Sequence, residues 1–144
     1  MFSIYIKVIA FIFLLTACGP STKKEDKGNE KFAVIAYYSG NSTLIDSFAV
    51  EKLTHIIFSF GHLKAGRLSI TNAGDTATIQ KLVSLKARNP ALKIILSLGG
   101  WGGCEFCSEV FATDAGRQAF AGSVRELMAY FKTDGIDLDW NIRY

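Results

Sequence analysis

The chain has 144 residues, with 16 Lys and Arg against 13 Asp and Glu, which gives a formal net charge of +3. Hydrophobic residues make up 49% of the chain and charged residues 20%, a composition typical of a globular domain and too apolar for a disordered chain. No basic run is longer than Lys23-Lys24, so nucleic-acid binding is excluded as a function. The length allows one small domain and excludes a complete large barrel.

Residues 1–17 have the features of a secretory signal peptide, with Lys7 followed by an apolar run and then small residues. The apolar run is well short of the roughly 20 residues that a membrane-spanning helix needs. The segment Leu15-Thr16-Ala17-Cys18-Gly19 resembles the lipobox of bacterial lipoproteins, in which the thiol of Cys18 receives a diacylglycerol. We therefore expect an exported bacterial lipoprotein of the cell envelope, anchored to the membrane through Cys18. The alternative is an ordinary signal peptide followed by an incidental cysteine.

Residues 18–31 are polar and charged, and we interpret them as a tether between the lipid and a domain that covers residues 32–144. In that domain, four short apolar runs bounded by glycine or polar turn residues predict strands, at residues 32–38, 53–60, 93–98 and 136–140. Because the runs are almost continuously apolar, both faces of these strands should be buried, as in parallel sheets.

Helical patterns lie between the expected strands. Asp75 is expected to cap a helix that stops at Asn89-Pro90, and Asp114 to cap a second helix. The second helix carries an apolar stripe that we interpret as core packing, formed by Phe120, Val124, Leu127, Met128 and Phe131. The crossover of residues 44–52 has room for only two turns. The alternation of strand and helix predicts an α/β fold with a parallel sheet.

Cys104 and Cys107 form a C-x-x-C pair, for which three states are open. A local disulfide fits an exported protein, and two free thiols are the second possibility. A metal site is the third and least favoured, because no second C-x-x-C follows and both histidines lie far back in the sequence. We expect neither a metal ion nor a cofactor.

In folds of this class, ligands bind at the carboxyl ends of the strands. The residues expected there are aromatic, glycine or acidic, and they include Tyr37, Phe60, Ser97, Gly99, Gly100, Trp101, Asp137, Asp139 and Trp140. Aromatic rings stack on the C–H faces of sugars while carboxylates bind the hydroxyls. Phosphate ligands would need amides and cations instead, and neither G-x-G-x-x-G nor a Walker motif is present. The sequence therefore favours a sugar ligand.

Asp137 and Asp139 share one face of the expected fourth strand, because side chains alternate along a strand, and position 141 shares that face. Two carboxylates stacked on an inward face raise each other's proton affinity, which predicts a pair that shares a proton. The alternative is a strand end with two solvated acids. Asp is depleted in strands, which favours a functional pair.

The run Asp134-Gly135-Ile136-Asp137-Leu138-Asp139-Trp140 resembles the D-G-x-D-x-D-W-E signature of glycoside hydrolase family 18, the chitinases and their relatives. Ser97-Leu98-Gly99-Gly100-Trp101 is similar to the S-x-G-G-W that follows the third barrel strand in that family. The segments at residues 54–60 and 36–38 are similar to its second and first strands. The resemblance implies a parallel (β/α)8 TIM barrel, of which residues 32–144 would supply about the first four β/α units.

The resemblance also implies an activity, namely retaining, substrate-assisted hydrolysis of β-1,4-linked N-acetylglucosamine polymers such as chitin. Asp139 would orient the acetamido N–H of the sugar, and Asp137 would exchange a proton behind it. Tyr37 and Ser97 match positions that line this subsite or support the acids. Gly99 and Gly100 would allow a close backbone approach, or would simply form a βα turn. Phe60, Trp101 and Trp140 complete the expected binding residues, and the two tryptophans favour chitinases within the family.

At position 141 the chain has Asn, where the family's motif has its general acid Glu. An amide has no proton to donate, and loss of a positioned acid costs roughly 10²–10⁴-fold in rate. One explanation is a chitin-oligosaccharide-binding, lectin-like lipoprotein that has lost catalysis. The other, which we favour, is a frameshifted or truncated and inactive chitinase fragment. Deleting one G from TGG GAA TAT CCG GTA T, which encodes W-E-Y-P-V, yields codons for W-N-I-R-Y, the residues found at 140–144.

Overall fold

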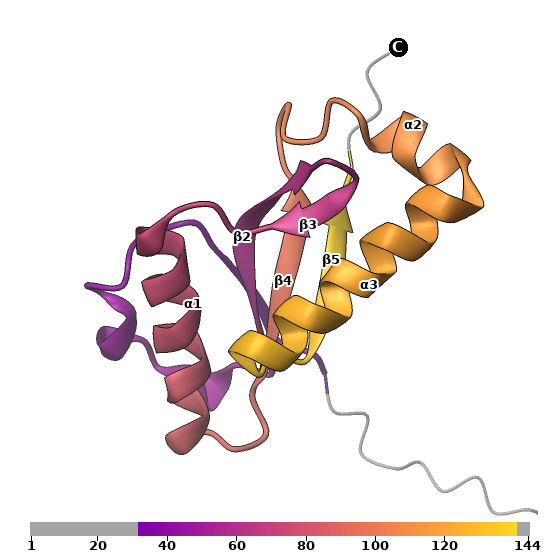
Figure 1. Cartoon of the computed structure of the whole chain (residues 1–144). Helices are drawn as coiled ribbons and strands as arrows, with labels where there is room; N and C mark the ends of the chain where they lie inside the picture. Colours follow the sequence, from indigo (N-terminus) through magenta and orange to yellow (C-terminus); the bar gives the residue numbers. More distant parts are fainter. Residues whose placement is uncertain (1–31, 141–144) are drawn as a thin grey trace, which may run out of the picture. The chain divides into compact units, whose positions relative to one another are not determined.

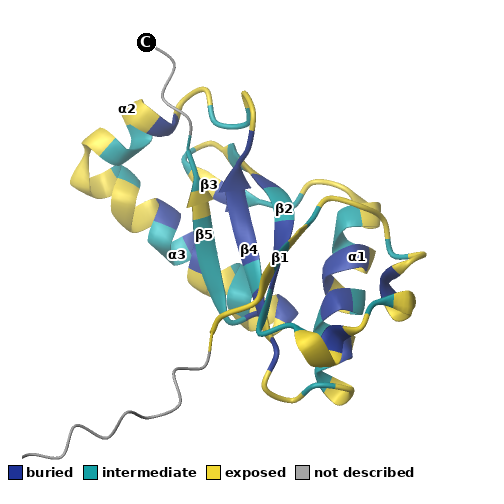
Figure 2. Cartoon of the chain, turned by 180° about the vertical axis from the view of Figure 1, so that it is seen from behind, coloured by how far each residue is buried: buried dark blue, intermediate teal, exposed yellow. Residues whose placement is uncertain are grey.

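The computed structural model describes residues 32–140, in which four parallel strands lie side by side in the order β1-β2-β4-β5 (Figure 1 and Figure 2). Their bounds are Ile35–Tyr38 for β1, His55–Lys64 for β2, Lys93–Gly99 for β4 and Gly135–Asp139 for β5. Each expected strand is therefore present, and the parallel sheet is confirmed. The expected signal peptide, Cys18 and the tether lie outside the described residues, as does Asn141.

The connections between the strands are helical or extended. Two 3₁₀ turns, Ile45–Ser47 and Val50–Lys52, link β1 to β2, in agreement with the two turns expected there. Helix α1, Ala73–Ser84, leads through a third 3₁₀ turn, Leu85–Ala87, to β4. Two helices precede β5, α2 at Cys107–Ala112 and α3 at Asp114–Phe131. None of the helices within residues 32–140 is long and apolar enough to span a membrane.

The hydrophobic core lies between the helices and one face of the sheet. Alternate residues of the two central strands, among them Ile56, Phe58, Ile94 and Leu96, pack in one cluster with apolar residues of α1, α2 and α3. Phe120, Val124 and Phe131 of the expected α3 stripe are buried in this cluster, and Leu127 and Met128 pack against it. Their interpretation as core is confirmed. Figure 2 shows the opposite face of the sheet, which no helix of the described chain covers.

The second strand differs from expectation, because it does not stop at Gly61. It continues to Lys64 with a register shift between Phe58 and Gly61, and turns into β3, Arg67–Ser69, which pairs antiparallel with it. The two loop residues, Ala65 and Gly66, both have positive φ, of 49° and 74°, as a two-residue hairpin turn of type I′ requires. The hairpin is fixed to α3 by the Leu68 N–H, which donates to Ser123 Oγ at 2.8 Å.

The helix caps also differ from expectation. Asn72, not Asp75, caps α1, and its Oδ1 accepts the backbone N–H of Asp75 at 2.7 Å. Thr113, not Asp114, caps α3 by accepting the N–H of Gly116 at 3.1 Å. In both helices the expected aspartate stands in the first turn, where a carboxylate is favourable beside the helix dipole.

Candidate functional site

The Asp137 carboxylate is the centre of a hydrogen-bonded group on the sheet face that the helices leave uncovered. Asp137 lies directly beside Ser97 in the register of β5 and β4. The Ser97 hydroxyl donates to Asp137 Oδ2 at 2.7 Å, and the Tyr37 hydroxyl donates to the same oxygen at 3.3 Å. Three residues expected at the site, from three different strands, are therefore brought together.

The environment of Tyr37 acts on its protonation. Partial burial raises the pKa of the Tyr37 hydroxyl, and so do the negative charge of Asp137, the hydrogen bond to Asp137 and the charge of Asp139. Each of these effects favours the neutral phenol over the phenolate. Tyr37 therefore stays a hydrogen-bond donor to Asp137 across the whole neutral pH range.

Asp139 lies on the same face as Asp137, two residues further along β5. Among residues 32–140, no hydrogen bond or ion pair engages its side-chain carboxylate, which is only half-buried. Its backbone oxygen accepts the N–H of Gly100 at 3.0 Å, which joins the end of β5 to the end of β4. The half-buried carboxylate is thus placed to accept hydrogen bonds from an N–H or O–H group of a ligand.

Gly99 and Gly100, at the end of β4, each allow another part of the chain to approach the backbone closely. A Cβ on Gly99, whose φ is +118°, would lie 2.2 Å from the backbone oxygen of Asp139. A Cβ on Gly100, with a φ of +79°, would lie 2.7 Å from the ring of Phe60. Gly99 therefore lets β4 and β5 converge at their carboxyl ends, and Gly100 makes room for the ring of Phe60, which lies within β2 because that strand continues past Gly61.

The two tryptophans take different positions. Trp101 lies on the loop after β4 with 86% of its surface exposed. Trp140 is half-buried, and its ring meets that of Phe111 edge to face at 5.5 Å, in the cluster on the helix-covered side of the sheet. Because side chains alternate along a strand, Trp140 lies on the same side as Ile136 and Leu138, opposite to the two acids. Of the expected binding residues, Tyr37, Ser97, Asp137 and Asp139 therefore share the uncovered face, whereas Trp140 lies on the helix-covered side.

Sequence reasoning assigned no role to Asp134, the first acid of the run at β5. Its side chain lies just before the strand, where Lys86 Nζ binds Oδ2 at 2.5 Å and the Ile94 N–H donates to Oδ2 at 2.8 Å. Partial burial raises its pKa, but these hydrogen bonds and the charges of Lys86 and Lys93 outweigh it and hold the pKa of Asp134 below its usual value. Asp134 therefore holds the start of β5, at the end of the strand opposite to the two acids. No sequence pattern paired it with the lysines.

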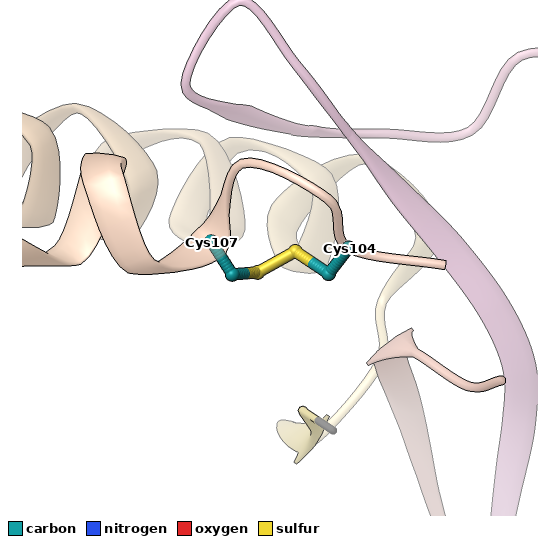
Figure 3. Close-up of a disulfide and its surroundings, with 2 residues drawn as sticks. All are labelled: Cys104 and Cys107. Atoms are coloured by element: carbon teal, nitrogen blue, oxygen red, sulfur yellow. A yellow bond between two sulfur atoms is a disulfide. The ribbon is translucent and has the colours of Figure 1, made fainter. Parts of the chain in front are cut away.

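Cys104 and Cys107 form a disulfide between the loop after β4 and the first residue of α2 (Figure 3). Of the three states left open by the sequence, this is the one present in the structure. Within the described part of the chain, no three His, Cys, Asp or Glu side chains gather as a metal site would require.

Asp137 and Asp139 stand at the carboxyl end of a parallel sheet, which is where α/β barrels carry their sites. Residues 33–144 match the model of the glycosyl hydrolases family 18. The chain therefore belongs to glycosyl hydrolase family 18, and its α/β sheet is part of that family's (β/α)8 barrel.

Three similar proteins illustrate the match. Mouse chitotriosidase-1 is 39% identical over 88 residues, which are 60% of this chain and 19% of that protein. Chitinase A1 of Niallia circulans is 43% identical over 76 residues, or 49% of this chain and 11% of that protein. The chitinase domain of the spore coat protein CotE from Clostridium difficile is 30% identical, with a TM-score of 0.69 over 85% of this chain and 34% of that one. The chain thus spans about a fifth or less of the two sequence relatives and about a third of the CotE structure.

Proposed function

We propose that this chain binds β-1,4-linked N-acetylglucosamine oligosaccharides at the carboxyl end of its sheet, as a chitinase-like family member. One observation carries the proposal: Asp137 and Asp139 share the uncovered face, with Asp137 fixed by Ser97 and Tyr37. Similarity to proteins named chitinases supports the choice of sugar.

In this proposal the two acids have different tasks. The Asp139 carboxylate accepts the N–H of the substrate acetamido group and turns its carbonyl oxygen toward the anomeric carbon. Attack by that oxygen would break the glycosidic C–O bond, whose leaving oxygen must take up a proton, and would give an oxazolinium ion that a negative charge at Asp139 would stabilise. Asp137, held by two donors at 2.7 and 3.3 Å, stays fixed on the same face, where the resemblance to the family assigns it a proton exchange with Asp139.

Binding is tested by calorimetric titration of the full chain with chitotriose. Asp139→Asn should weaken binding about tenfold to a hundredfold, because it removes a hydrogen bond to a charged group. Asp46→Asn is the matched control, since it makes the same change at an exposed aspartate paired with Lys81 on the surface. Cellotriose, which lacks the acetamido group, should bind weakly. Equal affinity for the two sugars, or no effect of Asp139→Asn, would contradict the proposal.

We further propose that the chain with Asn141 binds its sugar without cleaving it. The leaving oxygen of the glycosidic bond needs a proton, and the family motif supplies it from a Glu where this chain has an amide. The wild-type chain should therefore release no chromophore from a chromogenic chitobioside. Turnover by the wild-type chain would refute this.

Hydrolysis is the second candidate, because one deleted base would convert codons for W-E-Y-P-V, which include the family's Glu, into codons for the W-N-I-R-Y of residues 140–144. In that case Asn141→Glu should raise turnover about 10²–10⁴-fold. Asn141→Gln, which has the size of Glu but no proton to donate, should leave turnover at the wild-type level. Equal rates for the two variants would contradict a general-acid role at position 141.

For localisation we propose a lipoprotein anchored through Cys18, on the strength of the lipobox-like segment. Processing in bacterial cells should be sensitive to globomycin, and labelled palmitate should be incorporated. Cys18→Ser should abolish both. Palmitate labelling that persists in Cys18→Ser would refute lipid attachment at Cys18.

A further inference from the structure

Figure 1 shows the loop that leaves the carboxyl end of β4 and leads to α2. This loop carries two exposed aromatic residues, not one. Trp101 was expected at the site, but Phe106 follows it by five residues and has 54% of its surface exposed. Five residues place the two Cα atoms no more than about 18 Å apart. Both rings therefore lie within reach of one extended oligosaccharide.

Trp101 stands on a tight turn. The Gly103 N–H donates to the Gly100 oxygen at 3.0 Å, which closes a four-residue turn with Trp101 as its second residue. Gly102 follows with a φ of +70°, the conformation that a type II turn requires at its third position. A Cβ on Gly103 would lie 1.8 Å from the Gly99 oxygen. The glycines thus fold the loop back on the end of β4.

Phe106 stands on a second turn that follows directly. The disulfide between Cys104 and Cys107 closes this turn, with 5.3 Å between the two Cα atoms (Figure 3). Cys107 is fully buried in the core cluster, and Cys104 packs against it. The backbone that carries Phe106 is therefore tied to the core at both ends. A side chain on a pre-ordered segment loses less conformational entropy on binding.

We propose that Phe106 is an outer sugar-stacking residue, which binds units of a chito-oligosaccharide beyond those bound at Trp101 and the acids. This inference rests on the proposed function. Stacking needs an exposed ring on an ordered support, and Phe106 offers both, on the loop that leaves the strand of Ser97. Glu105 beside it is exposed and offers a carboxylate to sugar hydroxyls.

The test compares a short ligand with a long one, chitotriose with chitohexaose, by calorimetry on the full chain. Phe106→Ala should weaken chitohexaose binding about fivefold to tenfold, the effect of one lost aromatic contact, and leave chitotriose binding unchanged. Phe106→Trp should restore the wild-type affinity. Tyr130→Ala is the matched control, because it removes another exposed ring from the far end of α3, and it should change neither affinity.

The outcomes separate this inference from the function on which it rests. If the wild-type chain binds neither oligomer, the proposed function fails and the outer site fails with it. If both oligomers bind but Phe106→Ala weakens neither, or weakens both equally, the outer site alone is refuted. A loss in Phe106→Ala that Phe106→Trp does not restore also refutes stacking.

Discussion

At the scale of single residues, one carboxylate oxygen organises the site. Asp137 Oδ2 accepts both the fully buried Ser97 hydroxyl and the more exposed Tyr37 hydroxyl. Two donors aimed at one oxygen fix the orientation of the carboxylate. The neighbouring Asp139 can then use its own carboxylate for a ligand.

The protonation of Tyr37 reports directly on this arrangement. Asp137→Asn removes a negative charge and a charged hydrogen-bond acceptor, so the pKa of Tyr37 should fall toward the ordinary value for tyrosine. Burial and Asp139 still act on Tyr37, so a smaller elevation should remain. NMR titration of carbon-13-labelled tyrosine measures this, with Tyr37→Phe to assign the signal. An unchanged Tyr37 pKa would mean that Asp137 does not contact it in solution.

At Gly99 the neighbouring backbone leaves no room for a side chain. Gly99→Ala places a methyl group 2.2 Å from the Asp139 oxygen at a φ of +118°, and should destabilise the fold by about 2–3 kcal/mol. Gly122→Ala is the opposite case: it lies inside α3 with no atom within 4 Å of the added methyl. It should stabilise by about 0.5–1 kcal/mol. Urea unfolding measures both, and similar effects of the two substitutions would refute the close approach at Gly99.

At the scale of elements, the site depends on how β5 is held beside β4. The hydrogen bond from the Gly100 N–H to the Asp139 backbone oxygen joins the two strands at their carboxyl ends. At the other end, Asp134 accepts the Ile94 N–H and receives Lys86, while its own N–H donates to the Ile94 oxygen at 2.7 Å. The strand that carries both acids is therefore fixed at each end.

Asp134→Asn should destabilise the fold by about 1.5–3 kcal/mol near neutral pH, because Lys86 loses a charged, half-buried partner. The folded pKa of Asp134 is lowered, so its contribution is complete above the unfolded value of about 3.9. It is lost as pH falls through the lower folded pKa. The stability gap between wild type and variant should accordingly close in acid. Asp46→Asn, at an exposed pair, should cost no more than about 1 kcal/mol, and a gap that persists below the folded pKa would contradict the assignment.

The order and type of the main elements could be predicted from the sequence, because the spacing of apolar residues shows which faces of strands and helices are buried. The hairpin of β2 and β3 could not be predicted. Its turn is Ala65-Gly66 rather than the Asn-Gly or Asp-Gly typical of such turns, and Gly61 looked like the end of a strand. The caps failed for a related reason: Asn72 and Asp75, like Thr113 and Asp114, can both cap a helix, and only the fold decides between them.

At the scale of the whole domain, sequence pattern placed the acids on one face of β5 but could not show their contacts. Ser97 and Tyr37 come to Asp137 only through the register of separate strands. Trp140 was expected among the binding residues from its position in the motif. Its contact with Phe111 depends on α2, a helix that no clear sequence pattern predicted.

The burial of the two sheet faces and the strand order also predict which strands unfold locally and which unfold only with the whole domain. Strand β4 pairs with a neighbour on each side, and Ile94, Leu96 and Leu98 are fully buried. In the described residues β1 pairs with β2 alone, and Ile35 is 53% exposed. Amides of β4 should therefore exchange only through global unfolding, and those of β1 through faster local opening. Hydrogen exchange followed by mass spectrometry measures both strands at once. If β1 were as protected as β4, then its free edge or its exposed face would have to be covered in solution.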